Sequence, residues 1–451
     1  MKAAMTDRLP RQHFALLFVA LLVTAAGNTA LQTVLPAIGR QIGIPDLLVA
    51  LVFSLSALLW TFSAPFWAEA SDKRGRRRLM QVGVAGFGVS MLLCASIIVA
   101  GLNGIFAAVT TMILFTLARA IFGIFGSAAS PASQAYVASR TSEGERTTAL
   151  ATLSSAFGLG TILGPAIAPL FIIAPLGLSG PMFGFALIAF AVLVALQLGL
   201  PDDDPTHAIH LTRGYASGAS VAMPSVGGAA PGASITAAGE ATRRGKRERL
   251  SVRDPRVKPF MIFGFTSGSL QAVAGQTLGF LVIDRIQVPP AQAPQFLAII
   301  FMAGAGATLL AQWGLIRMLR LNPSQLMRYG TLLAALGTLW IAFAADFHAL
   351  VIAYALASLG YGFARPGFTA GSSLAVGPEE QGGVAGAVTA VNGACFIAAP
   401  FVGIGLYELI PTLPYELGAA GLAALLIYAW RNPVLRASAA HREPLADVEQ
   451  P

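Results

Sequence analysis

Twelve apolar segments, each about 20 residues or longer, account for most of this chain of 451 residues. A helix of that length covers the hydrocarbon core of a bilayer, and backbone polar groups in lipid must be satisfied within the protein. Each segment is therefore expected to be a membrane-spanning helix. Only 11% of the residues are charged, against about 25% in a soluble domain. The predicted fold class is an all-α polytopic membrane protein. The segments are residues 14–36, 47–70, 79–101, 105–138, 147–174, 178–200, 258–283, 292–316, 325–345, 348–376, 382–408 and 414–431.

The segments divide into six and six around a polar stretch that is rich in Gly, Ala, Ser and Pro and basic at its end. This composition is typical of a flexible linker. A shift of 235 positions lays Pro165 on Pro400, a weak internal repeat of the kind found in transporters whose site lies between two bundles. We therefore expect an N-terminal six-helix bundle over 1–200, a cytoplasmic flexible linker over 201–257, a C-terminal six-helix bundle over 258–431 and a disordered cytoplasmic tail over 432–451.

The net charge of +8 follows the same topology. Of the 29 Lys and Arg residues, 25 fall in the tails or in alternate loops, and short loops rich in Lys and Arg stay in the cytoplasm. The placement predicts an integral protein of the bacterial inner membrane with both termini cytoplasmic. It also accounts for the basic charge without nucleic acid, which we do not expect as a partner.

The loop between the second and third segments carries a recognisable motif. Asp72, Gly75, Arg76 and Arg77 fit the signature Gly-x-Leu-Ala-Asp-Arg-x-Gly-Arg-Lys/Arg. The chain departs from it at Ala68, where the signature opens with Gly, and at Ala70, where it has Leu. In this motif and in its order of spans the chain resembles the major facilitator superfamily, which implies twelve helices in two bundles and alternating access.

Two further motifs resemble the twelve-helix drug:proton antiporter branch, which includes tetracycline exporters. One lies in the fourth segment and the other in the fifth, where the usual final Gly-Gly is replaced by Ala168 and Pro169. The resemblance implies a proton as the coupling ion. The matching residues are Leu117, Arg119, Gly123 and Gly126 in the fourth segment, and Gly160, Gly164 and Pro165 in the fifth.

The loop motif suggests a gate at the cytoplasmic side. Asp72 can pair with a loop Arg, or it can face the positive N-terminus of the helix that begins near Gln381 in the other half. Gly75, Arg76 and Arg77 complete this gating hypothesis. The alternative is that the loop only sets topology, which explains the cations but not Asp72.

Polar residues at helical spacing mark candidate substrate contacts within the spans. Arg119 and Arg365 are candidates for coupling or anion contact, because an Arg at bilayer depth costs about 2.5–3.5 kcal/mol on insertion scales. Stripes spaced by three or four residues lie on one helix face and favour a shared cavity, although hydrogen bonding between helices is the alternative. The predicted substrate-binding residues are Asn28, Gln32, Gln271, Tyr361 and Asn392.

The spans contain no acidic residue near their middle, although the chain has 21 Asp and Glu. A cavity with two Arg and no acid is electropositive, which favours anionic or neutral substrates over cations. Four other residues are assigned to helix packing or to kinks: Gly123, Gly164, Pro165 and Pro400.

The sequence therefore predicts a secondary active transporter that exports a small amphipathic neutral or anionic compound, coupled to protons. An uptake permease for an organic anion or a sugar derivative fits the same residues. A non-transporting membrane receptor or scaffold is the alternative of another class. No His, Cys or carboxylate cluster lies at one membrane depth, so we expect no enzyme. We also expect no cofactor and no metal, and a monomer whose partners are its substrate, protons and the lipid bilayer.

Overall fold

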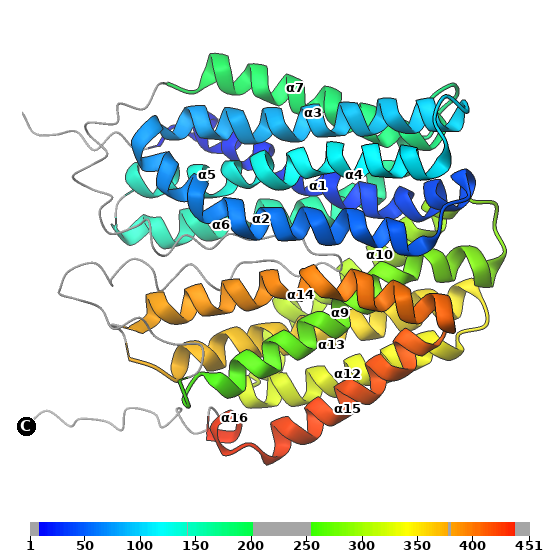
Figure 1. The fold of residues 1–451 in the computed structure, drawn as a ribbon. Coiled ribbons are helices and arrows are strands. Elements are labelled where there is room, and N and C mark those ends of the chain that lie inside the picture. The colour runs from blue at the N-terminus through cyan, green and yellow to red at the C-terminus, as the bar shows by residue number, and fades with distance from the viewer. Residues whose placement is uncertain (1–8, 142, 202–253, 378–379, 438–451) are drawn as a thin grey trace, which may run out of the picture.

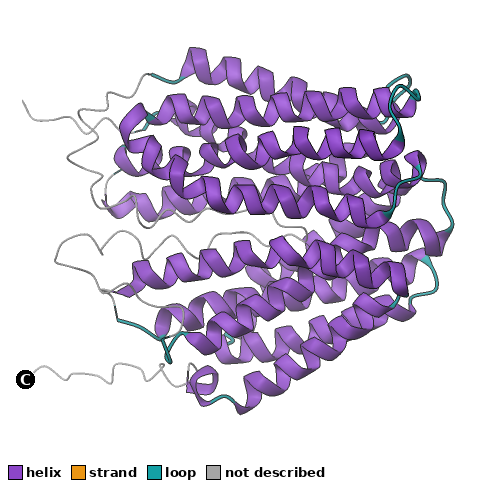
Figure 2. Ribbon diagram, in the orientation of Figure 1, coloured by secondary structure: helices purple, strands orange, loops and turns teal. Residues whose placement is uncertain are grey.

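The computed structural model describes residues 9–141, 143–201, 254–377 and 380–437. These residues form helices joined by short loops, and no strand occurs among them (Figure 2). The helices lie in two bundles side by side, α1–α7 in one and α9–α16 in the other (Figure 1). The predicted all-α fold with two bundles is confirmed.

The N-terminal bundle contains six spans, two of them continued by 3-10 turns. They are α1 (Arg11–Ile42), α2 (Asp46–Arg74), α3 (Arg76–Leu102), α4 (Ala108–Phe125) with η1 (Gly126–Ala128) and α5 (Ala129–Ser139), α6 (Glu143–Ile167) with η2 (Ala168–Phe171), and α7 (Gly180–Gly199) preceded by η3 (Gly177–Ser179).

The C-terminal bundle also contains six spans, one of which includes a π-helical turn. They are α9 (Lys258–Ile286), α10 (Ala293–Leu309) with η4 (Leu310–Leu315) and α11 (Ile316–Leu319), α12 (Pro323–Phe343), α13 (Phe347–Leu374), α14 (Gln381–Leu409) and α15 (Leu413–Arg431), followed by the short α16 (Pro433–Ala437). Eleven of the twelve spans are long and apolar enough to cross a membrane; the other, α9, is 29 residues long.

The two ends of the bundles have different connections. We call the end where Pro201 and Asp254 flank residues 202–253 the linker end, and the end where α1 joins α2 the far end. At the linker end, Gly75 joins α2 to α3 with φ 89° and ψ 135°. A residue with a Cβ is strained at such a positive φ, so the tight turn between these helices requires glycine.

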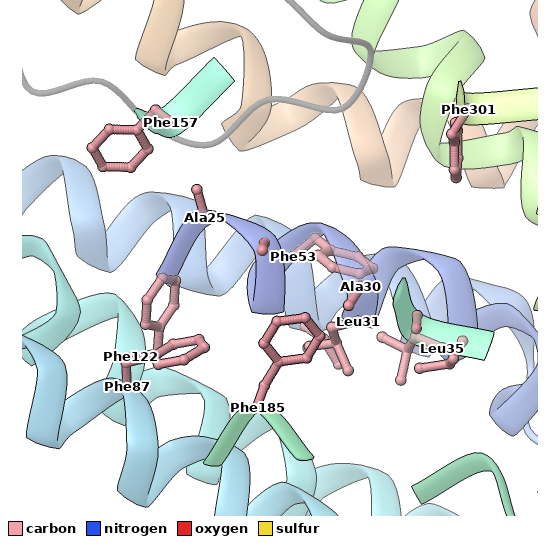
Figure 3. Close-up of a cluster of buried hydrophobic side chains, with 14 of the residues drawn as sticks. Ala25, Ala30, Leu31, Leu35, Phe53, Phe87, Phe122, Phe157, Phe185 and Phe301 are labelled. Carbon is pink, nitrogen blue, oxygen red and sulfur yellow. The ribbon is translucent and has the colours of Figure 1, made fainter. Parts of the chain in front are cut away.

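The core of the N-terminal bundle is built around α1. Figure 3 shows Phe87, Phe122 and Phe185 gathered on one side of this helix, close to Leu31. A Cβ at Gly27 would lie 2.4 Å from Cζ of Phe87. The absence of a side chain at Gly27 thus lets the rings reach the α1 backbone.

The C-terminal bundle extends beyond its predicted bounds at both ends. The prediction of a disordered tail from Asn432 is wrong for Pro433–Ala437, which form α16. The Asn432 side chain accepts from the backbone N–H of Val434 and Leu435, and Leu435 is fully buried. Burial of this apolar side chain against the bundle explains why the chain stays folded here.

The last residues of the predicted linker also belong to the C-terminal bundle. Val257 is fully buried, and the Arg256 guanidinium donates to both carboxylate oxygens of Glu380 at 2.9 and 2.7 Å. Arg256 also pairs with Asp254. The hydrogen bonds from Arg256 hold the pKa of both carboxyls below their usual values. This ion pair fixes the start of α9 beside the start of α14.

Candidate functional site

A pocket in the C-terminal bundle brings together four of the predicted site residues. Gln271 comes from α9, Tyr361 and Arg365 from α13, and Asn392 from α14. The remaining lining residues are Phe263, Gly264, Ser267, Gly268, Ala364 and Phe368.

Helical spacing places these polar groups on one side. Tyr361 and Arg365 are four residues apart on α13, and Ser267 and Gln271 are four apart on α9, so each pair shares a helix face. Gln271, Arg365 and Asn392 are only partly buried. Polar residues of these two helices therefore meet at one pocket.

The pocket combines aromatic surface with positive and neutral polar groups. Phe263 and Phe368 supply buried rings, while Gln271 and Asn392 supply amides. Arg365 supplies a guanidinium, and no Asp or Glu occurs among the lining residues. Such a set can hold an apolar body through the rings and orient an acceptor group, including an anion, through hydrogen-bond donors.

The other predicted Arg is enclosed in the N-terminal bundle. Arg119 on α4 is 1% exposed, its guanidinium donates to Oδ1 of Asn28 on α1, and it lies 4.2 Å from the centroid of the Phe122 ring. The Ser56 hydroxyl donates to the Arg119 carbonyl. Arg119 thus ties α4 to α1 and α2 in this conformation and does not line the pocket. Its assignment to coupling or anion contact stays a prediction.

The other predicted substrate residues of this bundle are similarly enclosed. Asn28 is 6% exposed and Gln32 9%. Both lie on α1, four residues apart, on the face that includes the Arg119 contact. Asn28 accepts an interhelical hydrogen bond from Arg119, and neither Asn28 nor Gln32 lines the pocket.

The residues of the loop motif lie at the linker end. Arg76 is 1% exposed, and the Arg77 guanidinium donates to the carbonyl of Gln197 in α7. This bond ties the loop to its own bundle. The Asp72 and Gln381 side chains lie outside the described residues, so the predicted gating contact between Asp72 and the start of α14 stays a prediction.

The predicted packing positions allow close helix approach. A Cβ at Gly123 would lie 2.9 Å from the Ser56 carbonyl oxygen, and one at Gly164 would lie 2.1 Å from the Ala26 carbonyl oxygen. Pro165 lies inside α6, shortly before this helix tightens into a 3-10 turn, and Pro400 lies inside α14.

Sequence reasoning missed a charged group at the far end. Nη2 of Arg40 donates to Oδ2 of Asp284 at 2.7 Å and to Oδ2 of Asp46 at 2.8 Å. The first of these contacts joins the two bundles. Because 244 positions separate its partners, no local pattern could have shown it.

Comparison with known proteins identifies the family. The family described as Major Facilitator Superfamily matches residues 17–440. Multidrug resistance protein MdtG of Proteus mirabilis is 27% identical over 162 residues, which are 35% of this chain and 37% of that protein. Puromycin resistance protein pur8 of Streptomyces alboniger is 30% identical over 158 residues, 34% of this chain and 29% of that protein. The matches thus span about a third of the length of these curated relatives.

Solved structures show the same fold over nearly the whole chain. The human organic anion transporter MFSD10 is 20% identical with a TM-score of 0.60, covering 94% of this chain and 100% of that one. The xylose transporter XylE from E. coli, in a partially occluded inward open conformation, is 13% identical with a TM-score of 0.64. The match covers 94% of this chain and 97% of that one.

The chain therefore belongs to the major facilitator superfamily, as its loop motif indicated. Members of this superfamily are integral membrane carriers and not enzymes. The described residues contain no group of three His, Cys, Asp or Glu that could hold a metal ion.

Proposed function

We propose that this protein is a secondary active transporter that exports a small amphipathic neutral or anionic compound in exchange for protons. The observation that carries the substrate class is the pocket, where Arg365 and two amides lie between aromatic rings without a carboxylate. A cationic substrate would meet a guanidinium with no counter-charge among the lining residues. An anion or a neutral acceptor group would meet donors only partly exposed to water, where charge-assisted hydrogen bonds are strong.

The comparisons support an anionic or neutral substrate and export as the direction of transport. One protein with the same fold is named an organic anion transporter. Two sequence relatives are named as drug resistance proteins, which favours export. Proton coupling rests on the antiporter-like motifs of the fourth and fifth segments, with Arg119 and Gly164 among their residues.

Uptake of an organic anion or a sugar derivative is the second candidate. A xylose transporter shares the fold, and the amides of Gln271 and Asn392 suit hydroxyl groups as well as carbonyls. A receptor or scaffold without flux accounts less well for the pocket, because it does not require partly exposed polar groups within the spans.

The orientation follows the basic loops. We place the protein in a bacterial inner membrane, with the linker end and both termini in the cytoplasm. We propose that the transport unit is a monomer. The bundles meet at the far end through Arg40 and Asp284. The far end is therefore closed in this conformation, and we propose that the pocket exchanges with the cytoplasm through the linker end.

Flux into proteoliposomes tests the proposal. The lumen is made acidic, and a carboxylated fluorescent dye, its neutral ester and a lipophilic phosphonium cation are supplied outside. Protons leaving the lumen should drive uptake of the dye or the ester, and collapsing the pH gradient should stop it. Uptake of the cation alone would overturn the substrate class, and uptake unaffected by the pH gradient would overturn proton exchange. Absence of flux for all three would leave the receptor as the better interpretation.

A further inference from the structure

Basic residues gather where α12, α15 and α16 meet at the linker end of the C-terminal bundle (Figure 1). Arg328 lies in the second turn of α12, Arg431 is the last residue of α15, and Arg436 lies in α16. None of the three forms an ion pair within the part of the chain that the structure describes. We call this place the basic junction; its positive charges have no carboxylate paired with them.

The sequence after α15 explains how Arg328 is held. In a continuing helix the Ala429 carbonyl would accept from the backbone N–H of residue 433, but Pro433 has no N–H. Nε of Arg328 donates to this carbonyl instead, at 3.3 Å. Neither Nη atom of Arg328 makes a hydrogen bond within the described residues. Both Nη atoms are thus left to donate to an acceptor from outside the chain.

Two contacts fix the surroundings of this guanidinium. Cζ of Arg328 lies 4.9 Å from the centroid of the Trp430 ring, a cation–π contact that holds it against α15. Arg436 is near enough to repel Arg328 electrostatically, and burial of Leu435 beside it keeps α16 in this place. Because packing holds two like charges near each other, an anion bound to both relieves their repulsion.

Exposed apolar side chains continue from the basic junction toward the middle of the spans. Leu332 follows Arg328 by four residues on α12, Ile427 precedes Trp430 by three on α15, and both apolar side chains are exposed. These intervals place each pair on one helix face, and α12 packs against α15. A ligand at this surface meets cations near the helix ends and apolar groups further in. A phospholipid has the same order of groups, its phosphate followed by its acyl chains.

We propose that Arg328, Arg436 and Trp430 form a binding site for the headgroup of an anionic phospholipid. The two guanidinium groups donate to phosphate oxygens, and the acyl chains lie along Leu332 and Ile427. The lipid thereby connects α16 to α12 and α15. None of these residues lines the Arg365 pocket, so the inference goes beyond the proposed function and holds whichever way the substrate moves.

Quenching of Trp430 fluorescence by brominated lipids tests the site. The full chain is reconstituted in phosphatidylcholine vesicles with increasing amounts of dibrominated phosphatidylglycerol or dibrominated phosphatidylcholine. The chain has five Trp, so the Trp430 signal is taken as the difference between each protein and the same protein with Trp430→Phe. Each Arg near an anionic lipid strengthens binding about fivefold. We therefore expect phosphatidylglycerol to quench Trp430 at about a 10- to 25-fold lower mole fraction than phosphatidylcholine.

Variants assign this preference to the basic junction. Arg328→Gln combined with Arg436→Gln should make the two lipids quench Trp430 equally. Arg436 is exposed, so Arg436→Gln alone serves if the double variant does not fold, and it should lower the preference about fivefold. Arg11→Gln combined with Arg78→Gln is the matched control, because both are exposed arginines at the linker end of the other bundle. This control should keep the wild-type preference.

Three results would overturn the lipid site. Equal quenching by both lipids in the wild type would mean that the arginines only set topology. A wild-type preference in the variants of Arg328 and Arg436 would place the selectivity elsewhere. Loss of the preference in millimolar inorganic phosphate, but not in sodium chloride of equal ionic strength, would assign the basic junction to a soluble anion.

Discussion

Substitution of Gly164 by alanine tests how closely α6 packs against α1. A Cβ at this position would lie 2.1 Å from the carbonyl oxygen of Ala26 and 2.2 Å from Oγ1 of Thr29. The carbonyl belongs to the backbone, so relief requires the two helices to move apart by about 1 Å. Overpacking of this kind costs about 1–3 kcal/mol, while the gain in helix propensity from Gly to Ala is about 1 kcal/mol.

We therefore expect Gly164→Ala to lose up to about 2 kcal/mol of stability. Gly306→Ala is the matched control, because a Cβ at Gly306 on α10 has no neighbour within 4 Å, and it should be as stable as the wild type or more so. A dye that fluoresces on reaction with the two buried cysteines, Cys94 and Cys395, reports thermal unfolding. A Gly164→Ala variant with an unchanged Tm would refute the backbone contact.

Two further predictions concern Asn28 and Glu380. Asn28→Leu leaves the buried Arg119 without its hydrogen-bond acceptor, and we expect it to lower the stability of the fold by about 3 kcal/mol, measured in the same thermal assay. An unchanged Tm would show that Arg119 finds another partner. The pKa of Glu380 is lowered by the hydrogen bonds that it accepts from Arg256. The ion pair between them is therefore fully present above the usual Glu pKa of about 4.3, and it is lost as pH falls through the lowered pKa. The rate of backbone amide hydrogen exchange at residues 254–257, corrected for the intrinsic effect of pH, should rise in that acidic range. Glu380→Gln should raise this rate already at pH 7. Exchange in this variant as slow as in the wild type would contradict a stabilising ion pair between Arg256 and Glu380.

Much of the fold could be predicted because lipid permits few alternatives. Long apolar segments must be helices, and the polar interval between the sixth and seventh segments divides them into two bundles. The π-helical turn at Leu310–Leu315 could not be predicted, since its residues continue the apolar pattern of α10. The short α16 was missed because it forms through burial of Leu435, a tertiary effect in a sequence of ordinary tail composition.

The candidate site was predictable where a single helix sets the geometry. Tyr361 and Arg365 share a face of α13 because they are four residues apart, and the structure places both at the pocket. The burial of Arg119 depends on how α4 packs against α1, which spacing within α4 does not determine. The contact of Arg40 with Asp284 depends on the docking of two bundles and was beyond any local pattern.

Binding of matched anionic and neutral compounds tests the central claim, that the Arg365 pocket selects its substrate by charge. The dissociation constants of a transported carboxylate and of its neutral amide are measured on purified wild type, Arg365→Gln and Arg119→Gln. A charge-assisted hydrogen bond contributes about 1.5–3 kcal/mol, so Arg365→Gln should weaken binding of the carboxylate about 10- to 100-fold and leave the amide nearly unchanged. Arg119→Gln should lower the stability of the protein but leave both dissociation constants nearly unchanged. Equal losses for both compounds in Arg365→Gln, or no loss for the carboxylate, would contradict the claim.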